Sequence, residues 1–196
     1  MRAPLPTSPA SLNSPLNPNP PPQPDTHSCS SDEKVYHESL VVPSMLLSNP
    51  KRVYIGGGGE LATAREVLRF PSVEACVMVD LDGELVDLCK ELMPEWSDGC
   101  HEDPRFSLIV GDAEAELRKV PGSFDLIIMD ISDPIEAGPG IKLYTKEFYT
   151  YARSRLNPGG VFVTQSGCAN PNNWDQCFAP VVKTCESVWE NVLPYR

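Results

Sequence analysis

Short apolar runs alternate with helical patterns along most of the chain, and this alternation constrains the fold more than any other feature. Runs of strand length occupy residues 52–55, 75–79, 106–110, 124–129 and 160–164. Helical patterns occupy 63–70 and 83–93, and Asn157-Pro158-Gly159-Gly160 predicts a turn before the last run. Strands that alternate with helices form parallel sheets through right-handed crossovers. We therefore predict a Rossmann-like α/β domain with helices on both faces of a parallel sheet.

The segment 83–93 carries apolar residues at helical spacing, namely Leu85, Leu88, Cys89 and Leu92. This spacing predicts an amphipathic helix that uses these residues as its apolar face, and Pro94 is expected to stop it.

The N-terminal segment differs in composition from the rest. Its first 24 residues hold nine of the 21 prolines, with serine and asparagine between them. Such a composition predicts a disordered or polyproline-like tail over 1–34, followed by a globular domain over 35–196. An inert leader is the favoured interpretation of the tail, and an SH3-type ligand or a targeting extension is the alternative.

The charge balance restricts the class of partner. The chain has 27 acidic and 16 basic residues, a formal net charge of -11, which disfavours nucleic acid and attracts polycations. Its seven cysteines and three histidines lack the spacing of a disulfide framework or a metal site, so we expect reduced thiols and no metal. No apolar stretch of about 18 residues predicts a membrane span, and the default location is the cytoplasm.

In open α/β folds the residues just after each strand form the ligand site. The run 124–129 is followed by Asp130 and Asp133, with Pro134 biasing Asp133 toward an extended conformation. One carboxylate of such a pair can bind a cationic amine while the other takes its proton. A primary amine has a pKa of about 10, so it needs a base before it can attack, and Asp130 is placed to be that base.

The other strand ends suggest an adenosine site. Gly57-x-Gly59-x-x-Ala62 fits a relaxed nucleotide fingerprint, although a flexible turn is the simpler alternative. Asp80 can accept the ribose hydroxyls or be an ordinary surface acid. Asp112 can accept the adenine amine or cap a helix. Glu60 would repel a pyrophosphate but can pair with the amine or sulfonium end of an adenosylmethionine derivative.

These residues resemble the spermidine synthases and, more closely, the thermospermine synthases. The resemblance covers about 36–195 and is carried by seven ordered motifs: Tyr36-His37-Glu38-Ser39-Leu40-Val41, Gly57-Gly58-Gly59-Glu60 with Thr63-Ala64-Arg65-Glu66-Val67-Leu68, Val79-Asp80-Leu81-Asp82, Gly111-Asp112-Ala113, Asp130-x-x-Asp133-Pro134-Ile135-Glu136, Leu143-Tyr144-Thr145-Lys146, and Leu156-Asn157-Pro158-Gly159-Gly160 through Gln165. It implies an adenosylmethionine-methyltransferase type of fold. It also implies an aminopropyltransferase that uses decarboxylated adenosylmethionine as co-substrate, without a prosthetic group.

The resemblance also assigns roles. Asp130 looks like the base that deprotonates the attacking amine. Polyamine-binding residues are implied at Tyr36, Glu38, Asp133 and Tyr144. Co-substrate contacts are implied at His37, Gly57, Gly58, Gly59, Glu60, Asp80, Asp112 and Ala113. Ordinary packing is an equal alternative for His37 and Tyr144. The expected partners are the polyamine and the aminopropyl donor, and a homo-oligomer is possible for this family.

The chain also departs from the family pattern. Family members carry a small β-domain before the Tyr-His-Glu motif and further strands after the position of Tyr195, so we expect a domain truncated at both ends. The last strand would then be an uncovered apolar edge. Leu61 replaces a usual glycine and is expected to weaken co-substrate binding by its bulk, and Val42 replaces a histidine. A noncatalytic remnant and an adenosylmethionine-dependent methyltransferase are the competing hypotheses.

Overall fold

The computed structural model describes residues 32–134, 138, 140–167, 169 and 174–195. The predicted tail therefore lies outside the described residues except at its last positions, where the first helix, α1 (Glu33–Ser48), already begins. Ile135 and Glu136 of the Asp-Pro-Ile-Glu motif also lie outside them.

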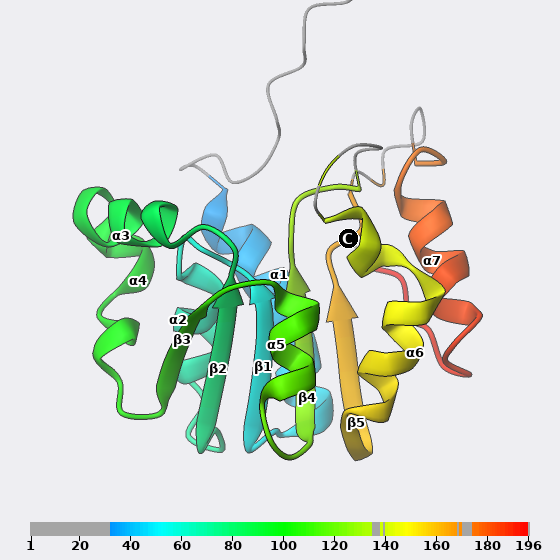
Figure 1. Ribbon diagram of the computed structural model, residues 1–196, viewed down its shortest axis with the longest axis horizontal. Helices are drawn as coiled ribbons and strands as arrows, with labels where there is room; N and C mark the ends of the chain where they lie inside the picture. Colours follow the sequence, from blue (N-terminus) through cyan, green and yellow to red (C-terminus); the bar gives the residue numbers. More distant parts are fainter. Residues whose placement is uncertain (1–31, 135–137, 139, 168, 170–173, 196) are drawn as a thin grey trace, which may run out of the picture.

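A parallel sheet of five strands forms the centre of the molecule, in the order β3-β2-β1-β4-β5 (Figure 1). The strands are β1 (Arg52–Gly57), β2 (Ala75–Asp80), β3 (Phe106–Val110), β4 (Phe124–Asp130) and β5 (Leu156–Thr164). The predicted Rossmann-like fold is thus confirmed. In β1, β2 and β4 the ladder continues past the predicted ends, so that Gly57, Asp80 and Asp130 are themselves the last strand residues.

Helices cover both faces of the sheet (Figure 1). On one face α1 and α2 (Ala62–Leu68) enclose a core that includes Val53, Ile55 and Ile128. On the other face α5 (Ala113–Lys119), α6 (Lys146–Ser154) and α7 (Phe178–Glu186) enclose a second core. The elements α3 (Gly83–Leu92), α4 (Pro94–Ser97) and the 3-10 helix η1 (Cys100–Glu102) connect β2 to β3, and a second 3-10 helix, η2 (Ile141–Tyr144), precedes α6.

The helix α3 has the predicted position but not the predicted buried face. Leu85, Leu88 and Leu92 are 44%, 51% and 64% exposed, whereas Val86 and Cys89 are buried. The expected leucine face was therefore wrong, because α3 packs through the narrower Val86 and Cys89 side and turns its leucines outward.

The predicted turn at Asn157 to Gly160 lies inside β5. Leu156 pairs with Phe124 and Val161 with Leu126, so the register between β4 and β5 shifts across the intervening residues, with Gly159 at a φ of 80°. The pairing of the two strands resumes at Val161.

The edge strand β5 is better covered than its sequence suggested. Among the described residues it pairs only with β4, which confirms its edge position. However, the ring of Phe162 stacks on Trp189 at 4.7 Å between centroids, and the Tyr195 hydroxyl lies 3.5 Å from the Leu40 carbonyl oxygen. Trp189, after α7, thus covers the side chain of Phe162, while β5 pairs with no further strand among the described residues.

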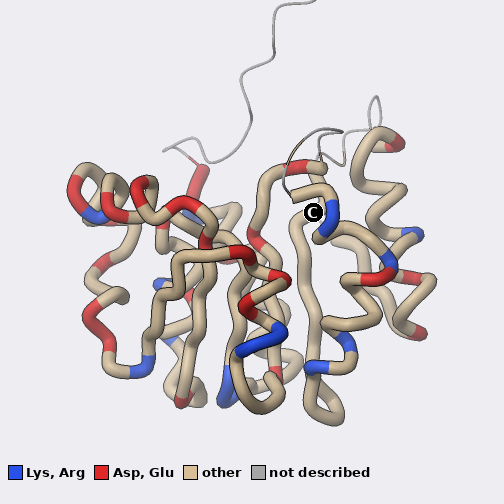
Figure 2. Tube along the Cα trace, in the orientation of Figure 1, with Lys and Arg blue, Asp and Glu red and all other residues tan. Residues whose placement is uncertain are grey.

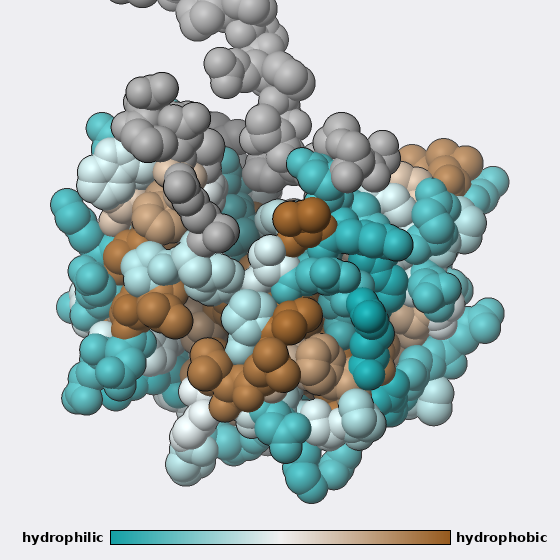
Figure 3. Space-filling view, turned by 180° about the vertical axis from the view of Figure 1, so that it is seen from behind, coloured by the Kyte–Doolittle hydropathy of each residue, from teal (hydrophilic) through white to brown (hydrophobic). Residues whose placement is uncertain are grey.

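The face covered by α1 and α2 shows a group of apolar residues low on its surface (Figure 3). The helix α1 exposes Leu46 and Leu47 by 72% and 73%. No helix among the described residues is long and apolar enough to span a membrane.

The homo-oligomer that is possible for this family stays a prediction.

Leu61 does not crowd the ligand site as expected. Its φ is 74°, its exposure is 0%, and its side chain belongs to the core beneath α1 and α2. The replacement of glycine at this position therefore adds a buried apolar contact at the cost of a left-handed backbone.

Urea unfolding can measure how the buried contact of Leu61 compares with the strain of its left-handed backbone. Leu61→Ala and Leu61→Gly should both destabilise the chain, because emptying a buried leucine site costs about 2–5 kcal/mol. Leu61→Gly should be the more stable of the two by about 1 kcal/mol, since glycine tolerates the left-handed conformation. At Leu68, a helical and 7% exposed control, alanine should be the more stable variant. The same order at both positions would contradict the strain at Leu61.

Candidate active site

A cleft with a volume of about 380 Å3 opens above the carboxyl ends of the strands. Its lining includes most of the predicted site residues: Tyr36, Gly57, Gly58, Gly59, Glu60, Asp80, Asp112, Ala113 and Asp130. Acidic residues gather at this edge of the sheet (Figure 2). Because four of the lining side chains are carboxylates, the cleft is suited to a cationic ligand.

Asp130 lies at the end of β4 with its carboxylate held from two sides. The Tyr36 hydroxyl donates to Oδ1 at 2.6 Å, and the Thr63 hydroxyl donates to Oδ2. Burial raises the pKa of Asp130 to about 6, and the Glu60 carboxylate adds to the rise. The structure thus supplies an oriented carboxylate that is a stronger base than an ordinary aspartate.

Gly57 allows the ends of β1 and β4 to meet. Its φ is 87°, and a Cβ atom there would lie 2.0 Å from the main-chain oxygen of Asp130. The next residue, Gly58, donates its N–H to the same oxygen at 3.0 Å. The glycine run is therefore required by the closeness of the two strand ends, and a flexible turn does not account for it.

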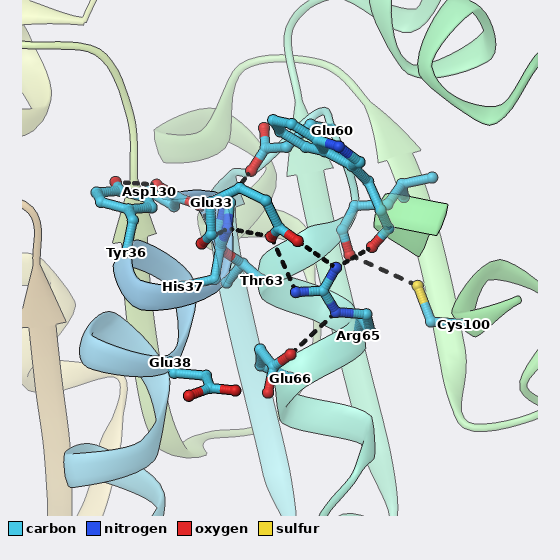
Figure 4. A network of polar contacts seen from close by, with 12 residues as sticks. Glu33, Tyr36, His37, Glu38, Glu60, Thr63, Arg65, Glu66, Cys100 and Asp130 are labelled. Carbon is cyan, nitrogen blue, oxygen red and sulfur yellow. Dashed lines mark hydrogen bonds and ion pairs between the residues drawn. The ribbon is translucent and has the colours of Figure 1, made fainter. Parts of the chain in front are cut away.

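His37 and Glu60 form a pair beside Asp130 (Figure 4). His37 is fully buried, and its Nε2 lies 2.9 Å from Glu60 Oε1 and 4.0 Å from Asp130 Oδ2. Glu60 follows the glycines and is 23% exposed at the cleft. His37 thus supports Glu60 from below and does not line the cleft itself.

The predicted adenosine contacts Asp80 and Asp112 lie on the cleft wall formed by β2 and β3. Burial raises the pKa of Asp80, and the charge of Glu60 contributes. Asp112 is the N-cap of α5, because its Oδ1 accepts the Ala115 N–H at 2.9 Å. Its Oδ2 accepts a hydrogen bond from Lys142, so both alternatives for Asp112 remain compatible with the structure.

Gln165, which follows β5, connects the predicted polyamine-binding residues Asp133 and Tyr144. Its amide nitrogen donates to Asp133 Oδ1 at 3.0 Å and to the Tyr144 hydroxyl at 2.9 Å. Tyr144 is 7% exposed, and its hydroxyl lies 3.1 Å from the Ser132 carbonyl oxygen. Tyr144 therefore contacts the loop after β4, to which Asp133 belongs, and neither residue is part of the cleft lining.

Glu38 is the predicted site residue whose side chain points away from the cleft and from Asp130. Its side chain is 51% exposed and lies 3.7 Å from Arg69, on the outer side of α1 and away from Asp130 (Figure 4). The reason is helical geometry, since α1 turns Tyr36 and His37 toward the sheet and Glu38 away from it. Glu38 belongs to a separate shallow pocket with Val42 and Glu66.

The sequence analysis missed three residues whose side chains bind the predicted aspartates of the site: Thr63, Lys142 and Gln165. Thr63 and Gln165 occur within the family motifs, and that occurrence was the available signal. Lys142 carried no signal, because its partner Asp112 is 30 positions away.

His37, Glu60 and Asp130 are also the described residues that could hold a metal ion, with one ligand atom each within 4.8 Å of one another. In the structure these atoms are engaged with one another and with Tyr36 and Thr63. The prediction that no metal is bound stays untested.

The family model described as "Spermine/spermidine synthase domain" matches residues 33–196. A polyamine aminopropyltransferase of Aeropyrum pernix is 48% identical over 172 residues, which cover 87% of this chain and 54% of that protein. A thermospermine synthase of Arabidopsis thaliana is 41% identical over 167 residues, covering 84% and 49%. The chain thus spans about half the length of the relatives it matches.

Solved structures of spermidine synthases are also similar to this chain. A spermidine synthase from Thermotoga maritima superposes with a TM-score of 0.68 at 32% identity, covering 80% of this chain and 51% of that one. A spermidine synthase in complex with the transition state analogue AdoDATO superposes with a TM-score of 0.70 at 34% identity, covering 80% and 52%. Human methyltransferase-like protein 13, with a TM-score of 0.61 and 18% identity over 86% of this chain and 77% of that one, shares the fold.

The raised pKa of Asp130 predicts a pH-dependent cost in stability. Folded Asp130, with a pKa of about 6, holds its proton more tightly than an unfolded aspartate, whose pKa is about 4. Its contribution to folding is therefore favourable at acid pH and is lost as the pH rises through about 4 to 6. Asp130→Asn, which stays neutral, should be more stable than the wild type at pH above 7 by about 1–3 kcal/mol, with little difference near pH 4.

Urea unfolding at several pH values measures this difference. Asp133→Asn, in the same loop, should keep the pH dependence of the wild type. An Asp130→Asn variant that is no more stable than the wild type above pH 7 would show that burial of this charge is not costly.

Proposed function

The chain belongs to the spermine/spermidine synthase family, and from this premise we propose that it transfers an aminopropyl group from decarboxylated adenosylmethionine to a polyamine. The observation that carries the proposal is the buried carboxylate of Asp130. It is oriented by Tyr36 and Thr63, has a raised pKa, and faces a cleft with acidic walls. Such a group can take a proton from a bound amine, which the other carboxylates attract.

The proposed reaction is a displacement at carbon. Asp130 takes a proton from the protonated amine, and the freed nitrogen lone pair attacks the carbon next to the sulfonium. The carbon–sulfur bond breaks, its electron pair stays on sulfur, and neutral methylthioadenosine leaves. The new nitrogen–carbon bond gives a longer polyamine. Because the sulfonium is already an activated leaving group, proximity and orientation supply much of the rate.

The proposed positions of the two substrates follow the walls of the cleft. Asp80 is suited to the ribose hydroxyls, and Asp112 with Ala113 to the adenine. Glu60 is suited to the cationic end of the aminopropyl donor. Asp133, fixed by Gln165, is suited to orient the polyamine beside Asp130.

Spermidine, giving thermospermine, is the proposed acceptor, and putrescine, giving spermidine, is the second candidate. The support for this order is the resemblance of Leu143-Tyr144-Thr145-Lys146 and the Pro134 region to the thermospermine branch, together with the similarity to the Arabidopsis thaliana protein. We also propose a cytoplasmic location, which the free thiols of the described cysteines support.

Release of methylthioadenosine tests the activity. The chain is incubated with decarboxylated adenosylmethionine and either spermidine or putrescine, and the two rates decide the acceptor. Asp130→Asn should lower the rate by about 10²- to 10⁴-fold, because the base is lost. Asp87→Asn, whose side chain is 80% exposed on α3, is the control and should keep the wild-type rate. Full activity of Asp130→Asn would exclude Asp130 as the base, and transfer of a labelled methyl group from adenosylmethionine would favour a methyltransferase.

The contact between Lys142 and Asp112 predicts a second effect. An adenine amine that binds Asp112 at Oδ2 competes with Lys142, which donates a hydrogen bond to the same oxygen. Lys142→Met should therefore tighten methylthioadenosine binding by about two- to fivefold, the range expected for releasing an exposed ion pair. Calorimetric titration measures this change. Lys119→Met, which removes the 2.7 Å pair with Glu116 in the last turn of α5, is the matched control. Unchanged binding in Lys142→Met would contradict competition between Lys142 and the adenine amine for Asp112 Oδ2.

A further inference from the structure

A row of buried charged side chains runs behind the cleft, from α2 through α1 to Asp130 (Figure 4). Arg65, Glu33 and His37 are 8%, 6% and 0% exposed, and the site residues Glu60 and Asp130 continue the row. Burying ions is costly unless each is paired. The ion pairs within this row therefore influence the charge state of the side chains next to the cleft.

Glu33 is held as a carboxylate by Arg65. The guanidinium donates to both Glu33 oxygens, at 3.3 Å and 3.0 Å, and also to Glu66 and to the Trp96 carbonyl oxygen. Burial alone would raise the pKa of Glu33, but the Arg65 hydrogen bonds and charge outweigh burial and lower it. Glu33 therefore presents a negative charge to the rest of the row.

The contacts of His37 determine where its ring carries hydrogen. Nδ1 lies 2.7 Å from the main-chain oxygen of Glu33 and 3.2 Å from its carboxylate Oε2, and both partners accept hydrogen bonds. Nδ1 must therefore carry a hydrogen. One further proton then lies between Nε2 and the Glu60 carboxylate, 2.9 Å apart.

That further proton belongs on His37. Burial alone would lower the pKa of His37, but Glu60, Asp130 and the bond to the Glu33 carbonyl raise it above the usual value. The charged groups around the ring are Glu33 from its own helix, Glu60 before α2 and Asp130 on β4, with Arg65 beyond Glu33. Three carboxylates around one imidazole favour the imidazolium.

We propose that Glu33, anchored by Arg65, is a positioning residue that keeps His37 as a doubly donating imidazolium, and that this charge offsets Glu60 and keeps Asp130 ionised. The link to Asp130 as a base rests on the proposed function, whereas the charge state of His37 does not. Without the imidazolium, Glu60 and Asp130 would face each other as like charges, and the pKa of Asp130 would rise further.

Nitrogen NMR of histidine-labelled protein tests the charge state directly. The chain has three histidines, and His37→Gln assigns the signal of His37 by its loss. Both ring nitrogens of His37 should stay protonated to a pH above the usual histidine pKa of about 6.5. A wild-type His37 that becomes neutral at or below that pH would overturn the proposal, whether or not the chain transfers aminopropyl groups.

Matched variants separate positioning from simple pairing with Arg65. Glu33→Gln and Glu66→Gln each remove a buried carboxylate bound to Arg65, but only Glu33 contacts His37. Glu33→Gln should lower the His37 titration midpoint by about one pH unit, and Glu66→Gln should leave it unchanged. Equal shifts in the two variants would reject a specific role for Glu33.

Should Glu33→Gln not fold, Glu60→Gln removes the other partner of the ring at a 23% exposed position and should lower the midpoint in the same way.

The consequence for Asp130 is measured separately, in the methylthioadenosine assay. The acidic limb of the pH–rate profile should move to higher pH in Glu33→Gln and His37→Gln, and should not move in Glu66→Gln. If His37 shows the expected titration but this limb stays in place, the link to Asp130 is rejected. An absence of transfer in the wild type at every pH would reject the proposed function while leaving the NMR result on His37 intact.

Discussion

The contact between the ends of β1 and β4 is the constraint on which the rest of the site depends. Gly58 donates its N–H to the main-chain oxygen of Asp130, and Gly57 leaves no room there for a side chain. This contact turns the chain away from β1, sets Glu60 at the cleft and starts α2, from which Thr63 reaches back to Asp130. A side chain at Gly57 would separate the two strands and disperse the groups that they bring together.

The closeness of the strand ends also brings the carboxylates of Glu60 and Asp130 near each other, and the side chains around Asp130 offset the resulting repulsion. Glu60 is near enough to disfavour the charge of Asp130, and the burial of Asp130 makes this repulsion stronger. Tyr36, Thr63 and His37 lie around Asp130 and favour its ionised form. The site therefore gives up stability for reactivity, as sites with buried acids generally do.

The sequence predicted the fold and the acids at the strand ends because both follow from local rules. Hydrophobic runs of strand length identified every strand, and in a parallel sheet the residues after β1, β2, β3 and β4 must meet at one edge. The same local rules were wrong for α3, whose leucines match a buried face by spacing yet are exposed. They also missed α1, in which Pro43 stands inside the helix. Packing against the sheet, and not the local pattern, decides both cases.

The sequence by itself determined the positions of the strands, the glycine turn and the identity of the acids, because each depends on neighbouring residues. Only the tertiary structure decided which of these side chains meet. It set Glu38 outside the cleft, Lys142 on Asp112, and His37 between Glu33 and Glu60. These contacts join residues far apart in the sequence, 30 positions in the case of Asp112 and Lys142, and their geometry exists only once the helices have packed on the sheet. The charge carried by a buried side chain depends on such contacts, so it is a property of the fold.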